Sequence, residues 1–287
     1  MRHPRRQQVL AAPFFLHDMA DTPTLSFQAF GKTDCGLMRE RNEDAFLALP
    51  KHAFFAVADG LGGLPEGSLA SSLAVECLKK WFDAPGRNGR LDLRGLFNLV
   101  NTRVYDEGRL VSLEVGIGTT LTAMRLVRNQ VEVAHVGDSG LYLFRNGQPA
   151  KKVTTDHTMA EEMRARLRPG DNIYIPDYYT HTLTRCIGQA GEIETDLVTV
   201  PVEAGDRLLL YTDGVTKVFH EEELNYEAWA NDTPEKLVSS MIKLGNERGG
   251  PDNLTAIAIY LGGGCVTVSH SSRCPPGNGR SPSRRPR

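Results

Sequence analysis

The order of its short apolar segments constrains the fold of this chain more than any other feature of the sequence. Between residues 119 and 144, three strand-like segments follow one another, with a turn at Arg128-Asn129 and another after them at Asn146-Gly147. Neighbours this close leave no room for a crossover helix, so they are expected to pair as antiparallel strands. Helical periodicity is confined to other stretches. We therefore predict an α+β fold, with mostly antiparallel sheets and helices packed outside them.

The remaining elements follow from periodicity and turn residues. Strands are predicted at 25–30, 53–58, 119–125, 131–136, 141–144, 197–202, 207–211 and 254–261. Helices are predicted at 68–82, 93–110, 159–167, 221–230 and 234–246. Residues 169–191 contain Pro169-Gly170, three tyrosines and three threonines, and are predicted to form a loop.

Charge divides the chain into three parts. Residues 1–24 carry a net charge of +1 and residues 262–287 a net charge of +5, which leaves 25 basic and 33 acidic residues between them. We predict a flexible N-terminal extension at 1–24, one domain at 25–261 and a disordered basic tail at 262–287, because the tail has few large apolar residues. The acidic body argues against nucleic-acid binding and suits a protein that collects cations.

The cysteines and apolar runs indicate the compartment. The five cysteines are odd in number and show no CxxC spacing, which predicts a reducing, cytoplasmic environment: Cys35, Cys77, Cys186, Cys265 and Cys274. No apolar run approaches the roughly 18 residues that span a bilayer, so no membrane association is expected. Residues 9–16 resemble a signal peptide poorly, and Met19 is an alternative start to Met1.

Four aspartates fall at the ends of predicted strands. Asp59, Asp138 and Asp213 each neighbour a glycine, and Asp252 precedes the last strand. An Asp-Gly pair taken alone is most often only a turn. Four carboxylates at strand ends are also what a Mg²⁺ or Mn²⁺ site requires, because these hard cations prefer oxygen ligands.

The aspartates belong to a set of short motifs. In chain order these are residues 36–44 (GLMRERNED), 57–63 (VADGLGG), 118–120 (GTT), 136–139 (VGDS), 155–158 (TDHT), 211–215 (YTDGV) and 252–255 (DNLT). In this order, over residues 27–261, they resemble the motifs of the metal-dependent protein serine/threonine phosphatases (type 2C, PPM family) in their bacterial form. One motif would be weak evidence, whereas the ordered set is specific.

The resemblance implies a four-layer α-β-β-α sandwich with a metal cluster of two or three Mn²⁺ or Mg²⁺ ions at one end of its sheets. It implies that Asp59 bridges two metals, with the Gly60 carbonyl on the first. Asp213 and Asp252 would hold the second ion, and Asp138 with Asp213 a third. Three further roles are implied: Glu43 and Asp44 near the metal-bound waters, Asn253 beside Asp252, and Arg39 on the substrate phosphate.

Physical chemistry supports this reading of the residues. A phosphate monoester repels an anionic nucleophile unless cations neutralise it, and paired metals both supply that charge and activate a water. The planar guanidinium of arginine can meet two phosphate oxygens at once. No cysteine stands in a phosphate-cradling loop, which disfavours a covalent thiol mechanism.

The expected activity is hydrolysis of phosphoserine and phosphothreonine in proteins by a metal-bridging hydroxide. The expected partners are phosphorylated proteins, including a serine/threonine kinase or its substrates, and the enzyme is expected to be a monomer. Two alternatives stay open. One is a weak or inactive phosphoprotein-binding regulator; the other is a phosphoesterase acting on a small molecule or on an antagonist protein of the anti-sigma type.

The sequence departs from the family pattern at several positions. Leu61 stands where eukaryotic relatives have a histidine proposed as general acid, so His157 and His181 become candidates for that role, each with a plain structural alternative. Gly140 replaces the usual arginine, and Lys217 stands where an acidic or neutral residue is common.

Residues 169–191 correspond to the family's flap, and match it poorly. Its tyrosines, Tyr174, Tyr178 and Tyr179, either contact a phosphoprotein or pack against the body. The basic tail either binds an acidic partner or is merely solvated.

Overall fold

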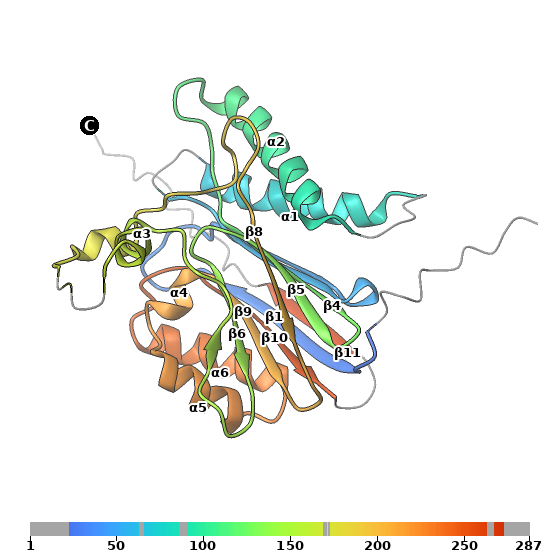
Figure 1. The fold of residues 1–287 in the computed structure, drawn as a ribbon. Coiled ribbons are helices and arrows are strands. Elements are labelled where there is room, and N and C mark those ends of the chain that lie inside the picture. Colours follow the sequence, from blue (N-terminus) through green and yellow to red (C-terminus); the bar gives the residue numbers. More distant parts are fainter. Residues whose placement is uncertain are drawn as a thin grey trace, which may run out of the picture.

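The computed structural model describes residues 23–62, 66–85, 91–168, 171, 173–262 and 267–272. Its strands form two stacked sheets (Figure 1). The first sheet contains, in order, β2 (Asp44–Leu49), β3 (Phe54–Asp59), β4 (Leu121–Val127), β5 (Gln130–Val136) and β8 (Asp196–Pro201). The second contains β11 (Thr267–Ser272), β1 (Phe27–Asp34), β10 (Leu254–Leu261), β9 (Arg207–Tyr211), β6 (Gly140–Phe144) and β7 (Lys151–Lys152).

Helices form a layer on each outer face. The first sheet is covered by α1 (Gly67–Asp83) and α2 (Leu93–Val111), and the second by α5 (Glu221–Ala230) and α6 (Pro234–Glu247) (Figure 1). Two shorter helices, α3 (Met159–Ala165) and α4 (Asp213–Thr216), lie toward one end of the sheets, and 3₁₀ turns occupy Pro50–His52 and Asp177–Thr180. The predicted α-β-β-α sandwich is confirmed.

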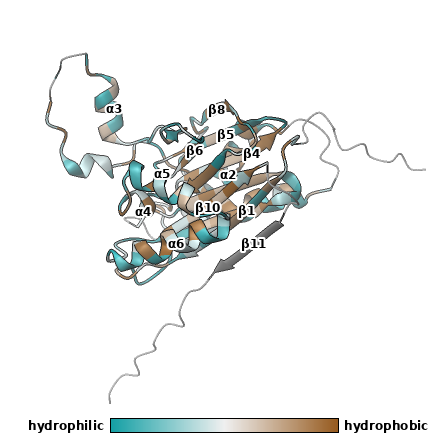
Figure 2. Cartoon of the chain, turned by 90° about the horizontal axis from the view of Figure 1, so that it is seen from below, coloured by the Kyte–Doolittle hydropathy of each residue, from teal (hydrophilic) through white to brown (hydrophobic). Residues whose placement is uncertain are grey.

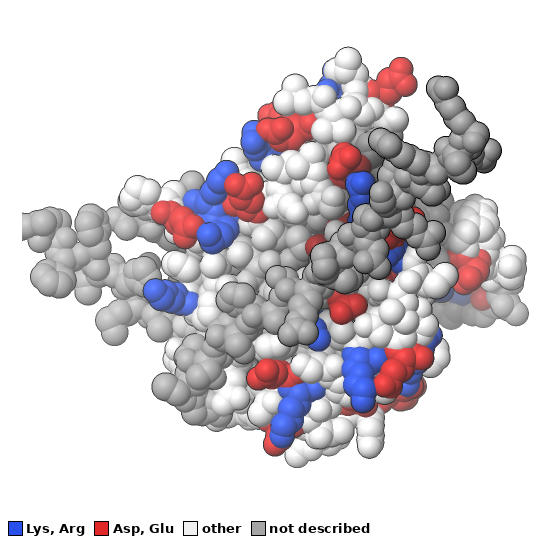
Figure 3. All heavy atoms as spheres, turned by 180° about the vertical axis from the view of Figure 1, so that it is seen from behind, with Lys and Arg blue, Asp and Glu red and all other residues white. Residues whose placement is uncertain are grey.

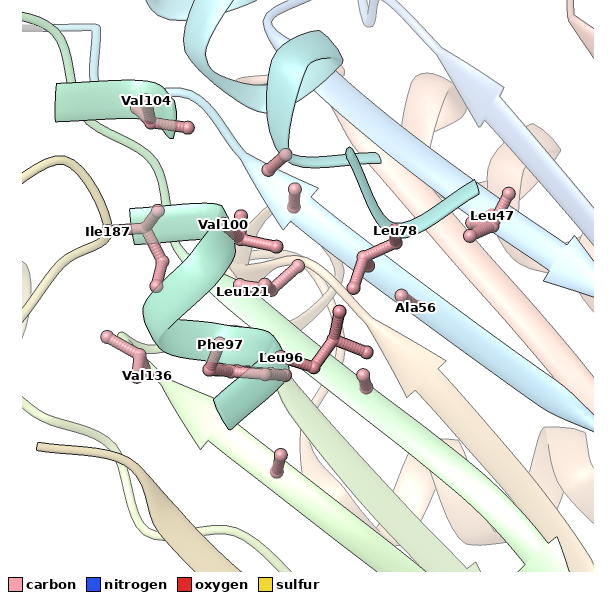
Figure 4. Packing of buried hydrophobic residues seen from close by; sticks show 14 of the residues in the cluster. Leu47, Ala56, Leu78, Leu96, Phe97, Val100, Val104, Leu121, Val136 and Ile187 are labelled. Carbon is pink, nitrogen blue, oxygen red and sulfur yellow. The ribbon is translucent and has the colours of Figure 1, made fainter. Parts of the chain in front are cut away.

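Alternation along the strands separates three apolar layers. In β3, Phe55 and Val57 lie between the sheets, whereas Phe54 packs toward α1 and α2. Figure 4 shows the outer layer of this half, in which Phe97 and Val100 of α2 lie over the sheet. Burial on both faces explains why these strands are almost continuously apolar in sequence.

The last strand of the body shows the same division. Every residue of β10 is buried; Ile257 and Ile259 lie between the sheets, and Ala258 faces α5 and α6. Figure 2 shows the apolar colour concentrated on the strands and hydrophilic residues on the outer surfaces of the helices. Helix α6 begins sharply because the Thr233 hydroxyl accepts a hydrogen bond from the Lys236 amide, and Pro234 fits the first turn.

All strand pairs are antiparallel except β1 with β11, which is parallel. The prediction of a disordered tail from residue 262 is therefore wrong for Thr267–Ser272, which form β11. Pairing with the edge of β1 satisfies backbone groups and needs little apolar surface, so composition was a poor guide here. Residues 1–22 and 273–287, which make up most of the two predicted terminal extensions, lie outside the described residues.

Elements β2, β7 and α4 were not predicted. β2 is only half buried and follows a charged loop, β7 has two residues, and α4 has four. Apart from β11 and the two 3₁₀ turns, the other elements lie within a few residues of their predicted bounds.

The helices and the surface charge bear on membrane and nucleic-acid binding. No described helix is both long and apolar enough to cross a membrane. On the face that Figure 3 shows, basic and acidic side chains of the described residues are interspersed. That part of the surface offers no continuous basic stripe for a nucleic-acid backbone.

Candidate functional site

One end of the two sheets carries the four aspartates. Asp59 ends β3, Asp138 lies in the turn between β5 and β6, and Asp213 begins α4 directly after β9. Asp252 precedes β10, and the pairing of β10 with β9 brings Asp252 to the same edge as Asp213. All four line one open cavity of about 230 Å³. The antiparallel topology thus gathers carboxylates that are far apart in sequence.

The other predicted site residues gather around the same cavity. Arg39, Glu43, Gly60 and Asn253 line it. Asp44 does not line it; it lies directly opposite Asp59 in the pairing of β2 with β3.

Asp44 is buried behind the cavity. Its Oδ2 accepts hydrogen bonds from the hydroxyls of Thr212 (2.8 Å) and Thr255 (2.6 Å), while its Oδ1 is buried with no hydrogen-bond partner among the described residues. Burial, with repulsion from Asp213 and Asp252, raises the pKa of Asp44 to about 7. A buried carboxylate oxygen without a partner indicates that a donor or a cation belongs nearby.

The carboxylates that line the cavity repel one another. Burial raises the pKa of Asp138 to about 8, and Asp213 and Asp156 add to the effect. Burial also raises the pKa of Asp59 well above its ordinary value, reinforced by Asp44, Asp213 and Asp138. Ionising the whole cluster is therefore unfavourable unless cations are present.

Two basic side chains supply part of the missing positive charge. Lys217 Nζ lies 2.5 Å from Asp213 Oδ2 and 2.6 Å from Asp252 Oδ2. Arg39 meets Asp252 with two nitrogens, Nε to Oδ1 at 2.8 Å and Nη2 to Oδ2 at 2.9 Å. Burial alone would raise the pKa of Asp252, but these partners lower it. Sequence analysis noted Lys217 only as a departure from the family pattern and did not foresee this contact.

The donor set suits a hard divalent cation. The cavity offers carboxylate oxygens and lacks thiols, which matches the preference of Mg²⁺ and Mn²⁺. Among the described residues, no three His, Cys, Asp or Glu side chains already stand in a ready-made ligand cluster. Arg39 and Lys217 contact oxygens of Asp213 and Asp252 that a metal would use.

The glycines beside two of the aspartates are required by packing. A Cβ at Gly60 would lie 2.1 Å from the Gly67 carbonyl oxygen, and one at Gly214 would lie 1.9 Å from the Asn253 carbonyl oxygen. Both Asp-Gly pairs therefore allow two backbone segments to touch beside the cavity.

A hydroxyl network joins Asp59 to the Asp138 turn, and sequence analysis assigned it no role. The Asp59 amide donates to Thr120 Oγ1 (2.9 Å), which shares a hydrogen bond with Ser139 Oγ (2.7 Å). Thr119 Oγ1 donates to the Asp59 carbonyl at 2.8 Å. These residues are buried, so they fix the backbone of Asp59 relative to the neighbouring turn.

Asn253 holds the segment that carries Arg39. Its Nδ2 donates to the carbonyls of Cys35 (2.9 Å) and Arg41 (3.0 Å), and its Oδ1 accepts from the Glu43 amide (2.8 Å). The side chain is only 5% exposed. One amide thus clamps both ends of the loop from which Arg39 reaches the cavity.

The two candidate histidines differ in position. His157 is buried; its Nδ1 accepts from the Gly137 amide (3.1 Å) and its Nε2 lies 3.3 Å from Asp196. His181 is exposed and lines the cavity, as does Leu61. His157 therefore has the structural role, and His181 is the histidine placed to meet a ligand.

The structure also shows the surroundings of Gly140 and of the tyrosines in residues 169–191. A Cβ at Gly140 would lie 2.4 Å from the Tyr211 hydroxyl, so that tyrosine takes the space of a side chain there. In the flap, Tyr174 is 85% exposed and Tyr178 is 63% exposed. Tyr179 is half-buried and its ring lies against that of Tyr178. Packing against the body is thus excluded for Tyr174 and Tyr178 only, and contact with a phosphoprotein stays a prediction.

No described cysteine lines the cavity. Cys35, Cys77 and Cys186 form no disulfide with one another, and none of the three belongs to the residues that line the cavity. Cys265 and Cys274 lie outside the described residues. A cysteine nucleophile thus has no support among the described residues.

Comparison with known proteins gives consistent matches. The family model described as Protein phosphatase 2C matches residues 38–255. The serine/threonine phosphatase stp of Listeria monocytogenes serovar 1/2a is 33% identical over 242 residues, covering 79% of this chain and 93% of that protein. PppA of Pseudomonas aeruginosa superposes with a TM-score of 0.71 at 30% identity, covering 82% of this chain and 98% of PppA. The catalytic domain of the phosphatase PstP, solved with two manganese ions, gives a TM-score of 0.68 at 29% identity, covering 83% of this chain and 99% of that domain.

Proposed function

Since the chain belongs to the protein phosphatase 2C family and is a serine/threonine phosphatase, we propose that it hydrolyses phosphoserine and phosphothreonine in proteins at the acidic cavity described above. The observation that carries this proposal is the convergence of Asp59, Asp138, Asp213 and Asp252 on one cavity beside an arginine. Buried carboxylates that repel one another create a demand for cations, and a phosphate ester needs the same positive charge.

Two or three Mn²⁺ or Mg²⁺ ions are the proposed cofactors. Asp59 with the Gly60 carbonyl, Asp213 with Asp252, and Asp138 with Asp213 would hold them. When bound, the ions would supply water activation, as the predicted bridging hydroxide, and charge neutralisation. Support comes from the donor set of this cavity and from the two manganese ions bound by PstP.

The other residues of the cavity have proposed roles toward substrate. Arg39 would bind the phosphate with its guanidinium, and its pairing with Asp252 holds it at the rim of the cavity. Asn253 would keep Arg39 and Glu43 in place. His181 would donate a proton to the departing serine or threonine oxygen, because Leu61 has no proton to give.

The proposed physiological setting is the cytoplasm, with a serine/threonine kinase or its substrates as partners and the enzyme as a monomer. It is supported by the relatives, which are named serine/threonine phosphatases, and by the exposed flap tyrosines, which suit contact with a protein surface. An inactive phosphoprotein-binding regulator is not favoured, because an unused site has no need to keep so many buried carboxylates together.

Phosphate release from a phosphothreonine peptide tests the activity. Mn²⁺ should support turnover, EDTA should abolish it, and Asp59→Asn should reduce kcat by at least about 10²-fold because a charged ligand is lost. Asp106→Asn on the exposed face of α2 is the matched control and should leave turnover unchanged. Absence of turnover while Mn²⁺ is demonstrably bound would overturn the proposal. Faster turnover of small phosphate esters than of phosphopeptides would point to a different substrate class.

A further inference from the structure

Lys217 is held in the cavity by two carboxylates from different elements. It follows directly after α4, and its amide donates to the Asp213 carbonyl at 2.9 Å. This helical geometry points its side chain back along the face that carries Asp213. The ammonium also reaches Asp252, which precedes β10. Lys217 therefore links two chain segments through its charge.

The contact differs from an ordinary surface ion pair. The side chain of Lys217 is 26% exposed, and those of Asp213 and Asp252 are 15% and 12% exposed. In the exposed pair of Lys236 with Asp232, by contrast, the side chains are 63% and 72% exposed. Water screens the Lys217 contacts less, so each is stronger than its surface counterpart.

The ammonium lies where a metal ion would bind. Asp213 and Asp252 are the pair proposed to hold the second metal, and Nζ lies within 2.6 Å of an oxygen of each. A divalent ion that used these two oxygens would compete with the ammonium for them, because both cations seek the same negative charge. Like charges this close together repel each other, so binding of one cation disfavours the other.

We propose that Lys217 is a tethered counterion that competes with one metal ion for Asp213 and Asp252, so that this ion binds only when the ammonium swings away. The inference rests on the proposed metal centre but not on turnover. A site that is open for only a fraction of the time binds its ligand more weakly by that same fraction. The protein thereby stabilises its acidic cavity without metal and lowers its affinity for one ion.

The first test measures Mn²⁺ binding to the full chain without substrate, by titration calorimetry and by the electron paramagnetic resonance signal of free Mn²⁺. Lys217→Met keeps the length of the side chain and removes its charge. We expect it to bind one ion about 10- to 100-fold more tightly than the unsubstituted protein. Lys217→Arg keeps the cation and should not gain affinity, and Lys236→Met should behave as the unsubstituted protein.

A second test measures the melting temperature, first without metal and then with it. In EDTA, Lys217→Met should melt several degrees below the unsubstituted protein, because two carboxylates lose their cation. Saturating Mn²⁺ should raise the melting temperature of Lys217→Met by more than it raises that of the unsubstituted protein. Lys217→Gln, which is polar but uncharged, gives the same comparison should the methionine variant fail to fold.

The outcomes separate this inference from the proposed function. Equal Mn²⁺ affinity in Lys217→Met and the unsubstituted protein would overturn the role of Lys217 and leave the metal centre intact. Weaker binding in Lys217→Met would also overturn it, since the lysine would then assist the metal. Failure of every variant to bind Mn²⁺ at millimolar concentration would overturn the metal centre, and the competition with it.

Discussion

At position 61 the chain has a leucine, which cannot protonate the serine or threonine oxygen that leaves phosphorus. His181 is the histidine that lines the same cavity, whereas His157 is 4% exposed and bound to the body. Of these two histidines, His181 is therefore the one placed to replace the missing acid. A general acid matters most when the leaving group is a poor one.

We predict that His181→Gln lowers kcat on a phosphothreonine peptide by about 10²-fold and hardly changes hydrolysis of an aryl phosphate, whose phenolate leaves without a proton. Measuring both substrates gives the ratio of kcat on the phosphopeptide to kcat on the aryl phosphate, which should fall in His181→Gln. His157→Gln should lower stability and leave that ratio unchanged. Equal losses on both substrates in His181→Gln would contradict the assignment.

Single residues also show where sequence reasoning stops. The aspartates could be chosen from the sequence because each belongs to a recognisable motif. The contact of Lys217 with both Asp213 and Asp252 could not, because it depends on the angle at which α4 leaves β9. The role of Ser139 was hidden for a similar reason: its partner Thr120 directly precedes β4, and the pairing of β4 with β5 brings the two residues together.

At the scale of elements, the loop between β1 and β2 depends on one side chain. Asn253 makes three hydrogen bonds to its backbone, to Cys35, Arg41 and Glu43. That loop has no helix or strand of its own between Asp34 and Asp44. The position of Arg39 therefore rests on an amide that lies more than 200 residues further along the sequence.

We predict that Asn253→Ala lowers the free energy of unfolding by about 2–4 kcal/mol, because it leaves buried backbone groups unpaired. It should also raise KM for a phosphopeptide, since the segment that carries Arg39 is released. Chemical denaturation and steady-state kinetics measure the two effects. Asn231→Ala, which removes an asparagine side chain that donates to Glu227 and does not line the cavity, is the control. Comparable KM values in the two variants would argue against the clamp.

Elements with strong periodicity could be predicted, and weakly patterned ones could not. Strands β9 and β10 have the predicted bounds, and helix α6 ends one residue beyond its predicted end, because burial on one or both faces dictates their sequence. β2 was missed because a half-buried strand between charged residues and Pro50 has little pattern to detect. The pairing of β11 depends on the free edge of β1, which no local sequence encodes.

At the scale of the whole molecule, the acidic cavity couples stability to pH. The pKa of Asp138 is about 8 in the folded protein, because of burial and repulsion, and about 4 when the chain is unfolded. Between these values the folded state keeps a proton that the unfolded state has lost. Raising the pH therefore favours unfolding, by up to about 1.4 kcal/mol per pH unit for this one group.

We predict that Asp138→Asn, measured in EDTA, becomes progressively more stable than the unsubstituted protein as the pH rises from 5 to 8. Thermal unfolding at a series of pH values follows the difference. Mn²⁺ in place of EDTA should shrink or invert it, because the carboxylate then has a cation. Asp106→Asn should show no such trend, and a difference for Asp138→Asn that is constant across this range would refute the coupling.

The strand that closes one side of the second sheet has a consequence for handling the protein. Without β11, the backbone amides and carbonyls of β1 from Gln28 to Thr33 would lose their parallel neighbour. Exposed sheet edges recruit strands from other molecules, which leads to aggregation. A truncation made after Gly262 to remove the basic tail would also remove β11. The shortened protein would then expose the edge of β1 and would be expected to self-associate.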